Sequence, residues 1–107
     1  MSLQQTFAAL GDTTRFAIVE RLLTEGELSA SALQQGTEIS APAISRHLKV
    51  LRQAGVVRQR PDAQRRLYSV EPAADQAIHS WTMDHRKFWE ASLDRLQAAL
   101  MQEKDRK

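Results

Sequence analysis

The spacing of apolar residues predicts two helices at the start of the chain. Leu3, Phe7 and Leu10 recur at intervals of four and three residues, which is typical of one face of an amphipathic helix. Asp12 or Thr13 can cap a second helix, because their side-chain oxygens accept hydrogen bonds from free backbone amides. The apolar stripe of the second helix consists of Phe16, Val19, Leu22 and Leu23. We therefore expect two short helices, each with one apolar face.

Two further helices joined by a tight turn are predicted after Gly26, which closes the second helix. A short helix comes first. Ser40 can cap the next helix, and Pro42 lies in its first turn, where no amide hydrogen is needed. This helix is expected to stop at Gly55, and its apolar face consists of Ile44, Leu48 and Leu51. The pattern predicts a helix-turn-helix over about residues 29–54.

A hairpin and one long helix are predicted for the rest of the chain. Two β-prone runs, 56–60 and 65–70, flank the turn-rich stretch 61–64. Pro72 begins a last helix, expected to run from about residue 73 to 101. The stripe of this helix contains Ile78, Trp81, His85, Phe88, Ser92 and Leu96, widened by Trp89, Leu93 and Leu100. The expected fold class is mainly α with a small β-hairpin.

Length and composition restrict the chain to one domain of ordinary globular type. It has 107 residues, of which 42% are hydrophobic and 26% charged, so we expect residues 1–107 to form a single domain. It has no cysteine, which excludes disulfides and thiolate metal sites. Neither a secretory signal nor a run of about 18 apolar residues is visible. We therefore expect a soluble, cytoplasmic protein with no membrane contact.

Positive charge is concentrated in the middle of the chain. Residues 41–70 carry seven basic groups and one acidic group, whereas residues 1–40 and 71–107 are net acidic. Six of the seven basic groups are arginine, whose forked guanidinium matches phosphate and guanine. Because this charge falls on the predicted helix-turn-helix and hairpin, it favours double-stranded DNA as the partner over a merely solvated surface.

The helix over residues 40–54 is predicted to turn a basic face outward. At about 100° per residue, Arg46 lies almost opposite Ile44 on the apolar face. Small residues near the helix start, Ala41 and Ser45, would allow close approach to a major groove. Lys49 and Arg52 lie further along the helix and suit phosphate contacts. In the hairpin, or wing, over residues 56–70 we expect further contacts from Arg58, Arg60, Arg65 and Arg66, with Arg65 nearest the tip.

Three segments resemble the ArsR/SmtB-type winged helix-turn-helix repressors. They are Ala-Leu-Gly-Asp-Thr-Thr-Arg-Phe-Ala-Ile over residues 9–18, Ser-Arg-His-Leu-Lys-Val-Leu over 45–51 and Arg-Arg-Leu-Tyr over 65–68. The resemblance implies a dimeric, cytoplasmic bacterial repressor. Because the two recognition helices of a symmetric dimer would meet successive major grooves, we expect it to bind an imperfect palindrome. Repression of its own gene is left open. The resemblance also implies that His47 contacts DNA. The predicted DNA-binding set is Ser40, Ala41, Pro42, Ser45, Arg46, His47, Lys49, Arg52, Arg58, Arg60, Arg65 and Arg66.

The sequence departs from the metal-sensing members of this family. Their thiol sensors place cysteines in the helix before the recognition helix, where residues 27–33 here read Glu-Leu-Ser-Ala-Ser-Ala-Leu. Other members bind zinc or nickel through the last helix, for which the candidates here are Asp75, His79 and His85. The family's wider spacing is not reproduced, and His85 falls on the apolar stripe, where we expect a packed histidine. We therefore expect no metal and no cofactor.

Aromatic and aliphatic residues near both ends predict a symmetric homodimer. The expected interface consists of Leu3, Phe7, Trp81, Phe88, Trp89, Leu93 and Leu96. A pocket for an apolar effector is the alternative for the aromatic residues, and the effector, whether a small molecule or a protein, is left open.

Two other functions compete with the repressor. One is a winged-helix module that binds a partner protein through residues 81–89, and the other is a metal-responsive repressor using the last helix. No phosphate-binding glycine loop, Ser/His/Asp set or zinc-hydrolase signature is present, so we expect no enzyme activity.

Overall fold

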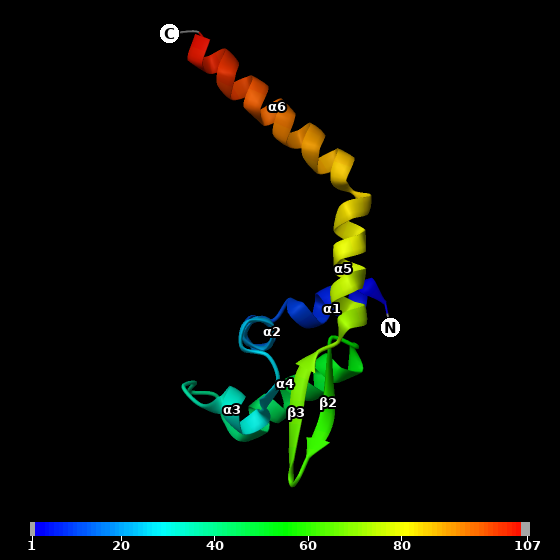
Figure 1. The fold of residues 1–107 in the computed structure, drawn as a ribbon. Helices are drawn as coiled ribbons and strands as arrows, with labels where there is room; N and C mark the ends of the chain where they lie inside the picture. The colour runs from blue at the N-terminus through cyan, green and yellow to red at the C-terminus, as the bar shows by residue number, and fades with distance from the viewer. Residues whose placement is uncertain (1, 106–107) are drawn as a thin grey trace. The chain divides into compact units, whose positions relative to one another are not determined.

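The computed structural model describes residues 2–105 of the chain. The chain forms two compact units, of which the first ends at Ala77 and the second begins at Ile78. The elements, in chain order, are α1 (Leu3–Leu10), α2 (Thr13–Glu25), β1 (Leu28–Ser29), α3 (Ala30–Gln34), α4 (Ala41–Gln53), β2 (Val57–Asp62), β3 (Arg65–Val70), α5 (Pro72–Asp84) and α6 (Arg86–Asp105) (Figure 1). Their number and order confirm the predicted mainly helical fold with a small hairpin.

Side-chain caps begin the helices of the first unit at the predicted places. Asp12 accepts a hydrogen bond from the backbone of Arg15, and Ser40 accepts one from the backbone of Ala43. Gly26 follows α2 with a φ of 85°, a left-handed conformation in which a residue with a Cβ is strained. These local signals explain why the helix boundaries were predictable from sequence.

The hairpin belongs to a three-stranded antiparallel sheet with the order β1-β3-β2. Strand β2 pairs with β3 from Val57–Val70 to Asp62–Arg65, and the two-residue strand β1 pairs with the other edge of β3. The sequence did not predict β1, and it placed Pro61 in the turn. Pro61 can continue β2 because β2 is an edge strand, where a missing backbone donor faces solvent. The turn is thereby shortened to residues 63 and 64, directly before Arg65, which confirms the predicted place of Arg65 near the tip.

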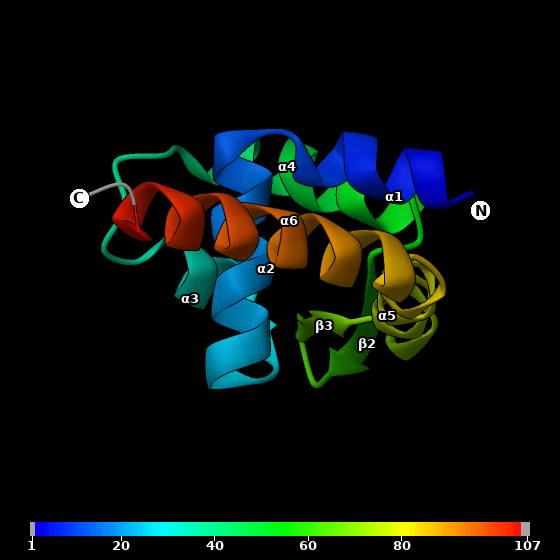
Figure 2. The same cartoon turned by 90° about the horizontal axis from the view of Figure 1, so that it is seen from above.

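The core of the first unit lies around α4, which α1, α2 and α3 all contact (Figure 2). Ile44, Leu48 and Leu51 are at most 1% exposed, as their spacing predicted. The remaining buried residues are Ala9, Ile18, Val19, Leu22, Leu33, Val56, Val57, Ala74 and the polar Thr6. The sequence reading of α2 was partly wrong, because Phe16 and Leu23 are 50% and 59% exposed. Ile18, which the predicted stripe did not include, lies on the buried face of α2 instead.

The predicted single C-terminal helix is two helices, with His85 between them (Figure 1). The His85 ring nitrogen Nδ1 lies 2.8 Å from the backbone oxygen of Trp81. The backbone amide of His85 donates to Thr82 instead, at 3.2 Å. When a side chain hydrogen-bonds the carbonyl oxygen four residues earlier, it replaces the backbone hydrogen bond that a regular helix makes there and interrupts the helix. The expected packing of His85 is confirmed in part, because its ring centroid lies 4.7 Å from that of Trp81, although the residue is exposed in the described chain.

Candidate nucleic-acid interface

The outward side of α4 presents Arg46 with no partner in the described part of the protein. Arg46 is exposed, and no residue from 2 to 105 forms a hydrogen bond or an ion pair with it. On the opposite side of the helix, Ile44 and Leu48 are buried in the core. This confirms the predicted orientation. An exposed guanidinium with all its donors available can make two parallel hydrogen bonds to one guanine.

The N-terminal turn of α4 offers small, exposed residues beside Arg46. The Ser40 hydroxyl lies 3.3 Å from the backbone nitrogen of Ala43 and is used as the helix cap. Ala41, Pro42 and Ser45 are exposed. Because none of these side chains is long, the helix backbone can come close to another surface at this end.

The structure places His47 away from this exposed side. The residue is partly buried, and its Nδ1 lies 3.5 Å from Arg15 Nη1 and 3.8 Å from Asp12 Oδ2. Arg15 also donates from Nε to the backbone oxygen of Ala9 at 2.7 Å. His47 and Arg15 therefore connect α4 with the corner between α1 and α2.

Asp12 is the anionic member of this junction. The backbone amide of Arg15 donates to its carboxylate at 3.0 Å, and this hydrogen bond is the largest cause that lowers the pKa of Asp12 below its ordinary value. The positive charge of Arg15 and the nearby His47 lower the pKa further. The folded chain therefore favours the charged form of Asp12, which also caps α2.

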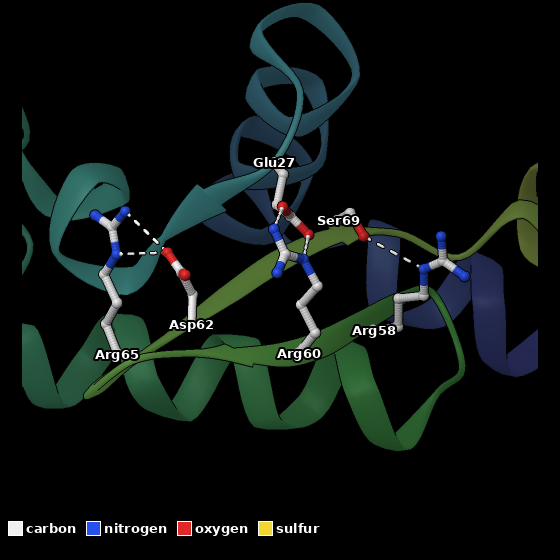
Figure 3. A network of polar contacts seen from close by, with 6 residues as sticks. All are labelled: Glu27, Arg58, Arg60, Asp62, Arg65 and Ser69. Atoms are coloured by element: carbon white, nitrogen blue, oxygen red, sulfur yellow. Dashed lines mark hydrogen bonds and ion pairs between the residues drawn. The ribbon is translucent and has the colours of Figure 1, made fainter.

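The wing has two sides with different surroundings, because successive residues of a strand point to opposite faces. The side chains of Arg58, Arg60 and Asp62 share one side of β2, and Gln59 lies on the other. Figure 3 shows the first three with Arg65 and Ser69 on this side, where Arg60 reaches Glu27 in the loop after α2. We call this the Glu27 side and the other, which contacts α4, the α4 side.

Carboxylates compensate the arginines on the Glu27 side of the wing (Figure 3). Arg60 makes a forked pair with Glu27, at 2.8 and 2.7 Å, and this hydrogen bonding lowers the pKa of Glu27 below its ordinary value. Both guanidinium contacts of Arg65 are with Asp62, at 3.1 and 3.2 Å. The Arg58 Nε lies 3.4 Å from the Ser69 hydroxyl. Two of these three arginines are therefore paired within the protein.

A cationic hollow of about 340 Å³ lies on the α4 side, between α4 and the wing. It is lined by Ser45, Lys49, Arg52, Gln53, Gln59, Arg66 and Tyr68. Three of these residues are positively charged, and no carboxylate lines the hollow. The predicted residues Lys49, Arg52 and Arg66 are thus brought together, although they come from a helix and a strand.

Three residues of this surface, Gln59, Tyr68 and Glu27, were not predicted from the sequence. Gln59 and Tyr68 are paired residues of β2 and β3 and lie on the same side as Arg66. The alternation of the hairpin could have indicated this, once its register was known. The contact of Glu27 with Arg60 joins residues 33 positions apart, for which the sequence carries no local signal.

The predicted dimer residues on α5 and α6 are exposed in the described chain. Trp81, Phe88 and Trp89 are exposed, and the rings of Phe88 and Trp89 pack edge to face at 5.1 Å. Leu93 and Leu96 are also exposed, together with Leu100 and Met101, which the prediction did not include. In α1, Phe7 is exposed and Leu3 is partly buried.

The candidate metal ligands are not gathered into one site. Asp75 and His79 lie exposed on α5, and the Nδ1 of His85 contacts a backbone oxygen. Within residues 2–105, no group of three or more His, Cys, Asp or Glu side chains could hold a metal ion.

Among the same residues, no helix combines the length and the apolar character needed to span a membrane.

Known proteins similar to this chain are regulators of transcription. Residues 10–60 match a family model described as a helix-turn-helix domain. The HTH-type transcriptional regulator Rv2034 of Mycobacterium tuberculosis is 40% identical over 83% of this chain and 79% of its own length. The arsenic resistance transcriptional regulator ArsR1 of Pseudomonas putida is 36% identical over 92% of this chain and 78% of its own.

A solved structure agrees with these relatives. The ArsR-like transcriptional regulator from Rhodococcus sp. RHA1 is similar with a TM-score of 0.70 and 28% sequence identity. The similarity covers 88% of each chain.

Proposed function

Because this chain belongs to the ArsR family of winged helix-turn-helix transcriptional regulators, we propose that it is a dimeric repressor of transcription. It binds a specific sequence of double-stranded DNA through α4 and the wing. The observation that carries this proposal is the exposed Arg46, which has no partner within residues 2–105 and projects beside a hollow lined by three cations. The action is binding rather than catalysis, and its setting is the bacterial cytoplasm.

We assign sequence recognition to the first half of α4. Arg46 donates to a guanine edge in the major groove, and Ser45 contacts the neighbouring base. Ser40, Ala41 and Pro42 allow the helix end to approach the groove closely. Lys49 and Arg52, further along the helix, contact phosphates, which fix the position of the helix without reading sequence.

The arginines of the wing divide into two roles in this proposal. Arg66 contacts DNA, and so does Arg65 at the tip. Arg60 holds the wing against the loop after α2, because its guanidinium is already paired with Glu27. Arg58 hydrogen-bonds the Ser69 hydroxyl and forms no ion pair with a described carboxylate, so its charge is available to the DNA backbone. His47 supports α4 from the side of α1 and α2.

The proposed dimer buries the apolar face of α6 against a second copy. Trp89, Leu93, Leu96 and Leu100 lie within about 60° of one another around the helix axis at 100° per residue. Each of these side chains is about half exposed or more. A contiguous, exposed apolar face of this kind is typical of an interface between proteins.

These 107 residues contain no cysteine, so the proposal includes no effector bound through thiolates.

Selection of bound sequences from random duplex DNA tests this function. A symmetric dimer predicts an enriched imperfect palindrome whose half-sites lie about one helical turn apart, roughly 34 Å, or a multiple of that distance. Failure to enrich any sequence over the starting pool would contradict the proposal. It would leave the alternative of a module that binds a partner protein.

A further inference from the structure

We propose that Arg52 and Arg66 form a clamp for a single backbone phosphate of DNA, and that Gln59 positions the two guanidinium groups. This proposal rests on the proposed function and specifies where one phosphate binds. The clamp joins the recognition helix to the wing, since Arg52 lies in α4 and Arg66 lies in β3. Each protomer would hold one such phosphate.

The charges in the hollow are arranged for an anion. Lys49, Arg52 and Arg66 line it together, and no carboxylate does. Elsewhere, Arg60 and Arg65 each contact a carboxylate within 3.2 Å, and so do Arg21 and Arg86 in other parts of the chain. Like charges that share a small space repel one another. A bound anion between them removes that repulsion and accepts their hydrogen bonds.

Gln59 is the neutral residue that holds the guanidinium groups of Arg52 and Arg66 close to each other. When its amide oxygen faces them, that oxygen lies 3.3 Å from both terminal nitrogens of Arg52 and 3.0 Å from Nη1 of Arg66. The amide nitrogen then donates to the Tyr68 hydroxyl at 3.2 Å, which fixes the orientation of the amide. A neutral oxygen orders both guanidiniums but leaves their two positive charges uncompensated. An acidic residue at this position would instead compensate them.

The position of the hollow beside α4 indicates that it binds a phosphate of DNA rather than a free anion. Ser45 and Lys49, on the exposed side of α4, line the same hollow. A helix lying in a major groove has phosphates on both sides of it. A phosphate that enters the hollow from this side of α4 meets Lys49, Arg52 and Arg66, which all line it. Two forked donors on one phosphodiester form strong charge-assisted hydrogen bonds.

The variant Gln59→Glu tests the positioning role directly. It introduces a carboxylate between the two guanidiniums, so it should compensate them and exclude the phosphate. We expect weaker binding to a selected duplex, a melting temperature equal to or above that of the wild type, and a smaller salt dependence of binding. The magnitude of the slope of log K against log salt should fall by about 0.9 per lost phosphate, or roughly 2 for a dimer. Gln76→Glu, an exposed change of equal charge on α5, is the control and should change none of these values.

A scan of neutral phosphates identifies the bound group. Each phosphate of the selected duplex is replaced in turn by a methylphosphonate, and binding is measured by fluorescence anisotropy for the wild-type chain and the double variant Arg52→Ala, Arg66→Ala. We expect one position per half-site at which replacement weakens the wild type about tenfold and leaves the double variant unaffected. The melting temperature with inorganic phosphate at constant ionic strength is measured in parallel.

The outcomes separate this inference from the proposed function. If the wild type binds the selected duplex but no position distinguishes it from the double variant, the clamp is wrong and the repressor assignment stands. If inorganic phosphate raises the melting temperature and no such position exists, the hollow binds a free anion, which also overturns the clamp. If the wild type binds no duplex selectively, the proposed function itself fails.

Discussion

Arginines of equal charge have unequal surroundings on the proposed DNA-binding surface. Arg46 has no partner among residues 2–105, whereas Arg60 makes a forked pair with Glu27. When the amide oxygen of Gln59 faces them, Arg66 and Arg52 share that oxygen. Pairing within the protein reduces what a guanidinium gains from a phosphate, because the internal partner must be given up first. We therefore expect the arginines to differ in their contributions, although the sequence alone made them look alike.

Ala63 at the tip of the wing has a strained backbone conformation. Its φ is 56°, in the left-handed region that costs a residue with a Cβ about 1–2 kcal/mol. Ala63→Gly removes this cost but increases the freedom of the unfolded chain, which offsets about 0.5–1 kcal/mol. We expect a net rise of about 0.5–1 kcal/mol in the free energy of unfolding, measured with urea. Gln64→Gly is the control and should lower it, and an equal effect of both variants would refute the strain.

At the scale of elements, sequence reasoning succeeded where the signal was local. The apolar face of α4 and its outward Arg46 followed from helical spacing, and the caps at Asp12 and Ser40 followed from residue type. The break at His85 did not, because it depends on which hydrogen bond one side chain makes. The ion pair between Glu27 and Arg60 also depends on how distant segments pack. The candidate site was thus predicted in its residues but not in their partners.

The junction of α4 with α1 and α2 gives a prediction for His47. Its ring contacts Arg15 and lies near Asp12, so His47→Ala should lower the free energy of unfolding by about 1 kcal/mol through the lost contacts. Ser45→Ala, an exposed neighbour on α4, should leave that free energy unchanged. Urea unfolding measures both. If His47→Ala instead preserves stability and weakens only DNA binding, His47 contacts DNA and our placement of it is wrong.

The anchoring of the wing predicts a loss of stability in acid. The pKa of Asp12 lies below its ordinary value of 3.8, and the pKa values of Glu25 and Glu27 lie below their ordinary value of 4.5. A lowered pKa means that the folded state favours the charged carboxylate. Its contribution is therefore complete above the ordinary value and is lost as pH falls through the folded-state value. Urea unfolding across this range should show a declining free energy of unfolding.

Glu27→Gln should make that decline shallower, because it removes one of these three carboxylates with a lowered pKa. Glu38→Gln is the control, since Glu38 is exposed and no ion pair or hydrogen bond links its side chain to another described residue. It should leave the pH dependence as it is. Identical curves for Glu27→Gln and the wild type would show that the pair with Arg60 does not anchor the wing.

At the scale of the whole molecule, the proposed repressor consists of two copies of the chain. We expect Leu93→Glu to convert a dimer into a monomer, because it places a charge within the apolar face of α6. Ala98→Glu lies on the opposite side of the helix, about 140° from Leu93, and should leave the dimer intact. Sedimentation equilibrium gives the mass of each variant. A wild type that sediments as a monomer, or a dimer that survives Leu93→Glu, would contradict this interface.

Arg46 is proposed to read a base beside the cationic wing, and fluorescence anisotropy of the wild type and Arg46→Ala measures this base reading. Each protein is titrated with the selected duplex and with a scrambled duplex at fixed salt. One forked contact to guanine contributes about 1–3 kcal/mol of discrimination. We therefore predict a loss of roughly 5- to 150-fold on the selected duplex and a much smaller loss on the scrambled one. Arg46→Lys should behave like Arg46→Ala on the selected duplex and like the wild type on the scrambled one, because it keeps the charge without the fork. Equal losses on both duplexes would contradict base reading by Arg46.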